Sequence, residues 1–298
     1  MTVSNLPLDE AHRLADEMDL LEPAPVSVSL VEEADEVCWR VEAHFASPPD
    51  TADVPMLAGR PWSLAPLPQR DWVAASLKGL APVRAGRFFV HGAHDRGRAP
   101  PGTKAIEIEA SLAFGTGHHG TTSGCLAALD QLLKEQAPCS RWLSPALDLG
   151  CGSGILAIAY AQATRLPVLA TDIDPVAVAQ ASANAIKCRV GPQLAARCAP
   201  GLSHPLIRSR GLYRLVMANI LAQPLKALAP GLCALLAAGG RVILSGFTHS
   251  QEARILAAYR PHGLLLHRRI RIDGWSTLVL GKPRKRTMPR SGASRHCP

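Results

Sequence analysis

Residues 146–159 have the sequence ALDLGCGSGILAIA, and this stretch decides the fold. Leucines flank Asp148, three glycines then follow at every second position, and a run with helical spacing completes it. This order predicts a strand, a tight turn and a helix. Glycine permits a positive φ at Gly150, Gly152 and Gly154 and removes the Cβ atoms that would hold a ligand away. Because the helix begins there with unpaired N–H groups and the positive end of its dipole, the turn suits a nucleotide-like ligand.

The glycine spacing distinguishes between two classes of nucleotide site. A dinucleotide motif has the form G-x-G-x-x-G, and its third glycine would fall at Ile155, whereas the chain has G-x-G-x-G after Asp148. A second acid, Asp172, follows about twenty residues later, after an apolar run, where a carboxylate can accept hydrogen bonds from both ribose hydroxyls. The combination resembles the S-adenosylmethionine site of Rossmann-like (class I) methyltransferases. The alternative is an ordinary strand–helix turn.

The bulk properties suit a two-domain globular protein. The chain has 298 residues, 47% of them apolar, and no apolar run of about 18 residues that would predict a membrane span. The N-terminus lacks the basic-then-apolar order of a secretion signal. Eight cysteines occur without a C-x-x-C motif, which favours reduced thiols over a zinc site or a disulfide framework. We therefore expect a cytoplasmic protein.

Charge is divided unevenly along the chain. Residues 1–60 carry thirteen acidic and three basic side chains, a net charge of −10, whereas residues 61–298 carry eleven acidic and twenty-nine basic ones, a net charge of +18. Six of those bases lie in 282–298, which contains no acid. An acidic segment beside a basic one indicates two kinds of neighbour, although solvated faces without partners would give the same counts.

The first part of the chain predicts a small α+β domain at 1–55. Residues 8–21 have helical spacing of their apolar positions, and two alternating segments, 26–30 and 37–45, indicate a hairpin. The sequence that follows is rich in proline, which is typical of a linker, and we place that linker at 56–75.

The second part predicts a catalytic domain at 76–281. Strand–helix alternation from about 105 to 280 favours a single α/β sheet. Near its end we expect a helix at 225–237, stopped by a pair of glycines, and a strand at 241–245. Residues 282–298 form a basic tail with the composition of disordered sequence.

A second glycine-rich loop, AFGTGHHGTT at 113–122, precedes a helical run at 123–136 that Thr121 or Thr122 can cap. Such a loop before a helix suits a carboxylate, for example the methionine end of the cofactor. The adjacent His118 and His119 suggest a metal site. Neighbouring residues seldom bind one ion, however, and no third ligand is evident, so we predict no metal.

Asn219 follows a buried strand at 213–218. Ligands of open parallel sheets bind at the carboxyl ends of the strands, so we expect Asn219 beside the glycine turn. A neutral carboxamide can orient the N–H groups of an amine without stabilising the ammonium form as a carboxylate would. The alternative is a plain turn residue at the end of a strand.

Four separated motifs together resemble the PrmA family of bacterial ribosomal protein methyltransferases, which modify protein eleven of the large subunit. They are the loop at 113–122, DLGCGSGILA at 148–157, DIDP at 172–175 and ANILA at 218–222. The glycine turn alone would indicate only the superfamily, whereas FGTGHH together with ANILA is more specific. The resemblance covers most of 70–282.

This resemblance implies a Rossmann-like methyltransferase domain preceded by a small ferredoxin-like domain that binds the substrate protein. The products would be methylated lysine side chains and a methylated N-terminal amine, and the acidic 1–60 segment suits a basic ribosomal protein as partner. Gly120 departs from the family, because many members have proline there, and the basic tail is not part of the family pattern. The resemblance also implies S-adenosylmethionine as cofactor, an amine-orienting role for Asn219, and cofactor contacts at Phe114, Gly115, Thr116, Thr122, Gly150, Gly152, Gly154, Asp172 and Asn219.

Two other functions are left open by the sequence. The net charge of +18 after residue 60 raises methylation of a nucleic acid base, but such amino-methylating enzymes usually carry Asn/Asp-Pro-Pro-Tyr/Phe where this chain has NILA at 219–222. The third candidate is a non-catalytic ribosome- or RNA-binding protein that uses the tail, and the intact glycine turn with Asp172 argues against it. Direct nucleic acid binding is compatible with the charge but is not required.

Overall fold

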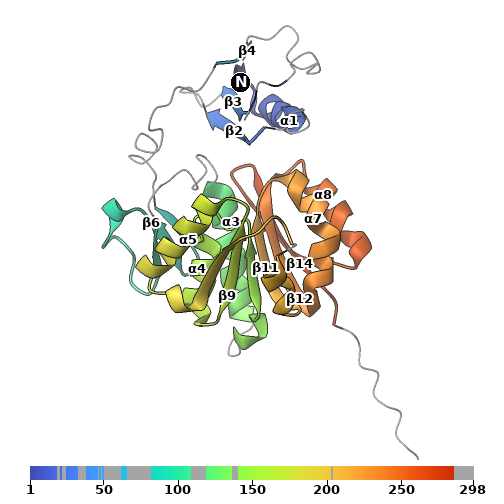
Figure 1. The fold of residues 1–298 in the computed structure, drawn as a ribbon. Coiled ribbons are helices and arrows are strands. Elements are labelled where there is room, and N and C mark those ends of the chain that lie inside the picture. Colours follow the sequence, from blue (N-terminus) through green and yellow to red (C-terminus); the bar gives the residue numbers. More distant parts are fainter. Residues whose placement is uncertain are drawn as a thin grey trace, which may run out of the picture.

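The protein consists of a small N-terminal unit and a larger C-terminal unit that carries the main sheet (Figure 1). This architecture is that of a computed structural model of the chain. Among the residues it describes, no helix is both long and apolar enough to cross a membrane. The described residues are 1–18, 21, 25–32, 38–45, 47, 49, 62–65, 82–108, 119–135, 140–202 and 204–284.

The N-terminal unit packs one helix on an antiparallel sheet. Helix α1 (Leu8–Met18) buries its apolar stripe against the sheet, and the unit has a hydrophobic core of its own. The predicted helix and hairpin are confirmed, and the strand order is that of a ferredoxin-like domain. The strands, in spatial order, are β2 (Ser27–Glu32), β3 (Trp39–His44), β1 (Thr2–Leu6) and β4 (Trp62–Ser63).

Strand β4 belongs to the segment predicted as a linker. It pairs with β1 through Thr2 opposite Ser63 and Val3 opposite Trp62, so the N-terminal sheet continues beyond residue 55. Two residues are too short to show an alternating pattern, which is why hydrophobic periodicity does not reveal this strand. The division into domains stays a prediction, and β4 favours a boundary after Ser63.

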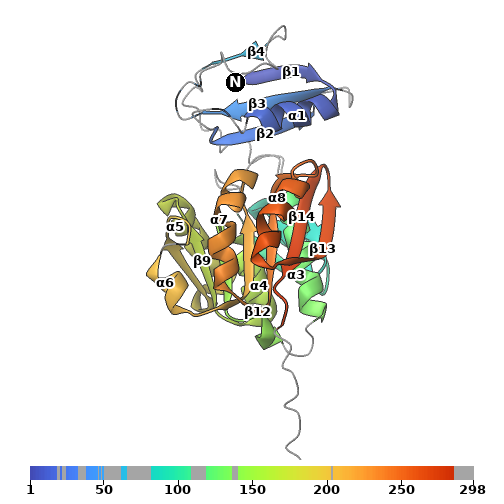
Figure 2. The same ribbon diagram turned by 90° about the vertical axis from the view of Figure 1, so that its right-hand side faces the viewer.

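Among the described residues, the main sheet has seven strands: the first six along the chain run in the same direction, and the last is inserted antiparallel between the fifth and the sixth (Figures 1 and 2). Parallel pairing brings the carboxyl ends of five strands to one edge, which faces the N-terminal unit. In spatial order the strands are β10 (Leu194–Cys198), β9 (Val168–Asp172), β8 (Ala146–Leu149), β11 (Tyr213–Asn219), β12 (Leu236–Thr248), β14 (Trp275–Gly281) and β13 (Leu265–Ile272).

Helices cover both faces of the main sheet and form two separate cores. Strand β8 shows the division, because Ala146 packs into one core while Leu147 and Leu149 pack into the other. The first core lies under α3 (His119–Glu135), α4 (Ile155–Thr164) and α5 (Pro175–Lys187). The second lies under α6 (Pro205–Ser209), α7 (Ala222–Leu235) and α8 (Glu252–Tyr259), with α7 and α8 side by side in Figure 2.

A separate three-stranded sheet precedes the main one. Strand β6 (Phe88–His91) pairs antiparallel with β5 (Val83–Ala85) and parallel with β7 (Lys104–Glu107). The prediction of a single sheet from about residue 105 is therefore wrong at its start, and the main sheet begins at β8. The small sheet packs on α3 and α4, and β6 is as fully buried as β8 of the main sheet, so the sequence pattern does not show that two sheets are present.

The glycine pair at 239–240 does not stop a helix, as the sequence suggested. Helix α7 ends at Leu235, and β12 begins at the next residue and runs through both glycines. Its register against β11 shifts there, and Gly239 has a φ of 79°. The glycines therefore accommodate an irregularity inside a strand. Helix α8 and the β13–β14 hairpin complete the unit after β12.

Candidate active site

The glycine turn forms a tight bend between β8 and α4. Gly150, Gly152 and Gly154 have φ values of 67°, 51° and 83°, a region of backbone conformation that favours glycine. The Gly150 N–H donates to the Thr171 carbonyl of the neighbouring strand at 2.8 Å, which fixes the bend to β9. A Cβ atom at Gly150 would also overlap Cγ2 of Ile220. The bend therefore depends on glycine both for its backbone conformation and for its packing.

Asp148 supports the bend from inside the protein. Its side chain is 1% exposed and accepts a hydrogen bond from the Ala157 N–H at 2.9 Å. That N–H belongs to the first turn of α4, where N–H groups lack partners within the helix. Burial raises the pKa of Asp148 to about 7; the Ala157 hydrogen bond lowers it, and the negative charge of Asp172 raises it further. Asp148 thus orients the helix end that forms one wall of the bend.

Asp172 faces the bend from the end of the adjacent strand. Its Oδ2 accepts from the Gly152 N–H at 2.8 Å, and its Oδ1 accepts from the Asp174 N–H at 3.1 Å. A carboxylate has about four acceptor positions, so these two bonds leave capacity for the hydroxyls of a sugar. The two backbone bonds also fix the rotamer. The placement of Asp172 beside the glycines agrees with the expectation from their spacing.

Asn219 lies at the end of β11, on the other side of β8. Its Nδ2 donates to Oγ1 of Thr121 at 3.3 Å. Thr121 is in the first turn of α3 and is 1% exposed. Within the described part of the chain, the carboxamide oxygen of Asn219 has no protein partner, so it is available to accept a hydrogen bond from a ligand.

Three neighbouring strands thus bring the bend, Asp172 and Asn219 to one edge of the sheet. The order β9-β8-β11 puts the carboxylate on one side of the bend and the carboxamide on the other. The edge offers a helix N-terminus, a backbone without Cβ atoms and an acceptor for a diol, which is the donor and acceptor set of a nucleoside site. In the described residues no three metal-ligating side chains gather.

Not every predicted site residue can be placed. Phe114, Gly115 and Thr116 lie outside the described residues. Thr122 lies in the first turn of α3, which begins at His119, four residues before the predicted start. Thr121 and Thr122 are therefore inside the helix, and neither caps it. The cofactor contacts of the predicted residues stay a prediction.

Comparison with known proteins identifies the family. The sequence profile described as "Ribosomal protein L11 methyltransferase (PrmA)" matches residues 23–283. The ribosomal protein L11 methyltransferase of Brucella suis (strain ATCC 23445 / NCTC 10510) is 46% identical over 255 residues, covering 86% of this chain and 84% of the relative. Its namesake from Rhodopseudomonas palustris (strain BisB5) is 48% identical over 252 residues, covering 82% of this chain and 84% of the relative.

A solved structure supports the same family assignment. The crystal structure of a ribosomal protein L11 methylase from Lactobacillus delbrueckii subsp. bulgaricus matches with a TM-score of 0.57 and 27% identity, over 68% of this chain and 100% of that chain. The chain belongs to the PrmA family. It is a methyltransferase of the Rossmann-like class I fold, and its cofactor is S-adenosylmethionine. The predictions of family, fold class, enzyme class and cofactor are confirmed.

In this PrmA family member, two residues of the site were not singled out from the sequence. Thr121 was considered only as a helix cap, and its contact with Asn219 joins residues 98 positions apart in the chain. Ile173, directly after Asp172, is 73% exposed. An apolar side chain left in solvent beside a sugar-binding carboxylate is placed to pack on the base of a nucleoside. Its signal in the sequence was an isolated apolar residue between two acids.

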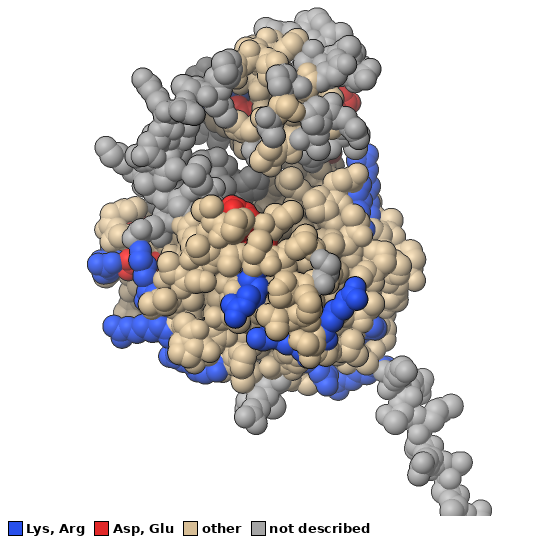
Figure 3. Space-filling model, in the orientation of Figure 1, with Lys and Arg blue, Asp and Glu red and all other residues tan. Residues whose placement is uncertain are grey.

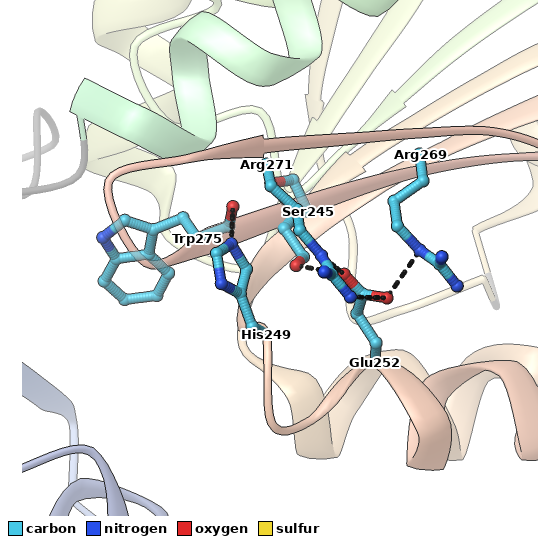
Figure 4. Close-up of polar contacts among 7 residues, drawn as sticks. Ser245, His249, Glu252, Arg269, Arg271 and Trp275 are labelled. Carbon is cyan, nitrogen blue, oxygen red and sulfur yellow. Dashed lines mark hydrogen bonds and ion pairs between the residues drawn. The ribbon is translucent and has the colours of Figure 1, made fainter. Parts of the chain in front are cut away.

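A buried ion pair holds the hairpin that lies beside the site. Figure 4 shows Arg269 and Arg271 reaching from β13 to Glu252 at the start of α8. Glu252 is 4% exposed and accepts from Arg271 Nε at 2.8 Å, from Arg269 Nε at 2.7 Å and from the Ser276 hydroxyl at 2.6 Å. Burial by itself would raise the pKa of Glu252, but the hydrogen bonds and the two arginine charges lower it below its usual value.

Ser245 connects this ion pair to Asn219. The Ser245 hydroxyl donates to the Ser276 carbonyl at 2.9 Å and accepts from the Thr277 hydroxyl at 2.9 Å. Ser245 on β12 also lies opposite Asn219 on the neighbouring strand β11. The Ser245 carbonyl accepts a hydrogen bond from the Ile220 N–H at 3.1 Å. The position of the Asn219 backbone is therefore linked through one strand to the ends of the hairpin.

Gly120 lies at a close contact between α3 and the hairpin. A Cβ atom at Gly120 would lie 2.8 Å from the Ile272 carbonyl oxygen and 2.9 Å from Cδ1 of Trp275. The hairpin turn thus packs directly on the first turn of α3, one residue before Thr121. Any side chain at Gly120 would push the hairpin away from this helix.

The N-terminal unit contacts the catalytic unit next to the same hairpin. The Ser250 hydroxyl donates to Oδ2 of Asp16 on α1 at 2.9 Å. Gly274, in the hairpin turn, approaches His12 of α1 so closely that a Cβ atom would lie 3.2 Å from its Cε1. Burial lowers the pKa of His12, and His249 lowers it further, against the opposing charges of Asp16 and Asp9. The contact therefore joins the two units at the edge of the site.

Proposed function

We propose that this methyltransferase modifies lysine side-chain amines and the N-terminal amine of a large-subunit ribosomal protein in the cytoplasm. The observation that supports the site best is Asp172, whose Oδ2 is 2.8 Å from the Gly152 nitrogen, one strand away from the bend. The substrate is supported by the name shared by the relatives, ribosomal protein L11 methyltransferase.

The residues of the bend fit the cofactor as follows. Asp172 accepts from the ribose hydroxyls, Ile173 packs on the base, and the backbone at Gly150 and Gly152 allows the ligand to approach because no Cβ atom intervenes. Phe114, Gly115, Thr116 and Thr122 hold the methionine end. When bound, S-adenosylmethionine would supply an electrophilic methyl group on a positively charged sulfur.

Asn219 orients the substrate amine. Only a neutral amine has a lone pair, and a lysine with a pKa of about 10.4 costs about 4.6 kcal/mol to deprotonate at pH 7. Exclusion of water by the substrate lowers this cost because it disfavours the ammonium form. The carboxamide oxygen accepts an N–H of the neutral amine, which directs the lone pair to the methyl carbon. The amine nitrogen would bond to the methyl carbon as the carbon–sulfur bond breaks, S-adenosylhomocysteine would leave, and the extra amine proton would pass to solvent. Positioning by the protein would therefore provide most of the acceleration.

The N-terminal unit binds the substrate protein. Residues 1–60 have a net charge of −10, which complements a basic ribosomal protein. The unit sits over the edge where the parallel strands end, so a protein bound to it can present an amine to Asn219 (Figure 1).

Intact-mass analysis tests this function directly. The enzyme is incubated with S-adenosylmethionine and purified large-subunit ribosomal proteins, and each protein is weighed before and after. We expect mass increases in multiples of one methyl group, about 14 Da, confined to one ribosomal protein and mapped by fragmentation to lysines and the N-terminus. Labelled methyl groups that appear in ribosomal RNA instead would contradict the proposal.

The Asn219→Ala variant separates positioning from binding. It retains the bend and Asp172, so we expect cofactor affinity within a few fold of wild type. The methylation rate should fall by about 10²-fold, because a misplaced nucleophile loses the advantage of orientation. Equal rates in the two proteins would remove Asn219 from the mechanism.

A further inference from the structure

The end of the sheet remote from the site carries an unusual cluster of cations, which we call the Trp142 cluster. Three guanidinium groups surround the Trp142 ring, with their Cζ atoms 5.6 Å (Arg214), 5.8 Å (Arg241) and 5.3 Å (Arg284) from its centroid. These are cation–π distances. Arg284 and Trp142 also pack on Gly239, where a Cβ atom would lie 3.0 Å from Cγ of Arg284.

Carboxylates do not neutralise the Trp142 cluster. Among the described residues, Arg214 and Arg241 donate only to backbone carbonyls, at 3.2 to 3.5 Å, and Arg284 makes no ion pair. Nε of Arg241 is buried without a hydrogen-bond partner. Glu135 is the acid whose charge acts on Arg241, and it is already bound to Arg268 and His267. In this part of the structure three like charges around one ring therefore lack a fixed counterion, which favours an anion from outside.

The cluster lies at the opposite end of the strands that form the site. Arg214 is the second residue of β11 and Asn219 is the last, so about 16 Å of strand separates them. An anionic ligand on the cluster would leave the methyl-transfer edge accessible. Figure 3 shows lysine and arginine side chains over the lower half of the molecule, where acidic side chains are few.

The basic tail leaves the described structure from this cluster. Lys282 fixes the end of β14, because its Nζ donates to the Cys233 and Leu236 carbonyls at 2.9 and 2.8 Å. Two residues later, Arg284 contacts the Trp142 ring. The sequence after it contains no acidic residue and four basic ones, Lys285, Arg286, Arg290 and Arg295. The sequence next to the cluster is therefore basic as well.

We propose that the Trp142 cluster is an RNA-binding surface, separate from the methyl-transfer site. Guanidinium groups match phosphates with two parallel hydrogen bonds, and both guanidinium groups and aromatic rings can stack on bases. The combination of arginines with an aromatic ring favours a nucleic acid over an acidic protein or an anionic membrane, which offer no bases to stack.

Binding of a fluorescein-labelled single-stranded RNA of about 20 nucleotides to the full-length protein tests this surface. Fluorescence anisotropy is followed from 50 to 200 mM KCl. The R214Q/R284Q double variant should bind about tenfold more weakly at 100 mM KCl, with a slope of log K against log salt that is smaller by about 0.7 for each phosphate that the variant no longer binds. The Trp142→Phe variant should bind RNA better than Trp142→Ala.

The matched control is R84Q/R254Q, which removes two exposed arginines from β5 and α8 and leaves the cluster intact. We expect it to bind RNA as wild type does, and all variants to methylate the isolated protein substrate at wild-type rates, so failure here is distinct from failure of the proposed function. If the double variant unfolds, Arg284→Gln alone, at an exposed residue after the last strand, should give half the change in slope.

Three results would overturn the proposal. The first is equal weakening by R214Q/R284Q and R84Q/R254Q, which would indicate bulk charge without a site. The second is unchanged RNA binding in the cluster variants. The third is tighter binding of polyglutamate, or of vesicles containing phosphatidylglycerol, that the cluster variants lose while RNA binding persists.

Discussion

At the residue scale, Asp172 contributes both to the structure of the bend and to ligand binding. Asp172→Asn keeps the shape of the side chain but replaces one acceptor oxygen with an NH₂ group. That group would face the Gly152 N–H or the ribose, so one hydrogen bond to a charged acceptor is lost. Such a hydrogen bond contributes about 1.5–3 kcal/mol. We expect affinity for S-adenosylmethionine to fall by about 10- to 100-fold, measured by isothermal titration calorimetry.

Asp273→Asn is the control for this substitution. Asp273 is exposed and has a φ of 48°, which asparagine tolerates, so the change removes the same charge at another surface. Its cofactor affinity should equal that of wild type. Asp172→Asn with undiminished affinity would show that the carboxylate does not contact the ribose.

Asp148 predicts a pH dependence of stability. Its pKa is about 7 in the folded protein against an ordinary value of 3.8, so between these pH values the folded state holds more protons than the unfolded state. This group's contribution to stability is therefore full near pH 4 and is lost as pH rises to 7. Asparagine mimics the protonated form, and Asp148→Asn should become increasingly more stable than wild type over that range. Urea unfolding at pH 4.5, 6 and 7.5 measures the difference, and a constant difference would contradict it.

At the element scale, the β13–β14 hairpin depends on the buried carboxylate of Glu252. Glu252→Gln loses the charge attraction to Arg269 and Arg271, and its NH₂ group replaces one of the acceptors. We expect the free energy of unfolding to fall by about 1–3 kcal/mol, because the partners are half exposed and retain water. Chemical denaturation measures the loss.

The pH dependence of the same element follows from the lowered pKa of Glu252. Its stabilisation is present above the ordinary pKa of 4.5 and is lost as pH falls through the folded value. In Glu252→Gln this component is absent. Wild type and variant should therefore converge in stability at low pH, and a difference that grows on acidification would be inconsistent with the ion pair.

Elements and site residues with a local signal were predictable from the sequence. The glycine bend, the strand before it and Asp172 lie within about thirty residues and follow one another at the spacing of a βαβ unit. Asn219 was predictable because strand ends of a parallel sheet meet at one edge. The partners of these residues were not predictable from the sequence. Thr121, Ser245 and Glu252 reach the site only through sheet pairing and the hairpin. Strand β4 and the first residues of β12, 236–240, were missed because neither stretch alternates in hydrophobicity.

At the scale of the whole molecule, the N-terminal unit has a core that includes no residue of the catalytic unit among those described. A chain that lacks residues 1–65 should therefore fold and retain the bend. We expect its affinity for S-adenosylmethionine to stay within about twofold of wild type, whereas methylation of the ribosomal protein should be lost with the acidic binding surface. Titration calorimetry and intact-mass analysis give the two readouts. Loss of cofactor binding in a folded truncated protein would count against the separation of the two roles.

The contact between the units predicts that their arrangement depends on pH. Nδ1 of His12 is buried without a partner, and the groups that face this ring are Asp9 and Asp16 on α1 and His249 from the catalytic unit. The pKa of His12 is lowered from 6.5, so the docked state binds its proton more weakly than the undocked state. Docking should thus be stable above about pH 6.5 and weaken as pH falls below it.

Small-angle X-ray scattering of the wild-type protein should show a larger radius of gyration at pH 5.5 than at pH 7.5. The His12→Gln variant should stay compact at both pH values. His262, an exposed histidine in the 3₁₀ turn after α8, provides the control, and His262→Gln should behave as wild type does. Expansion of wild type and His12→Gln to the same extent would remove His12 as the titrating group.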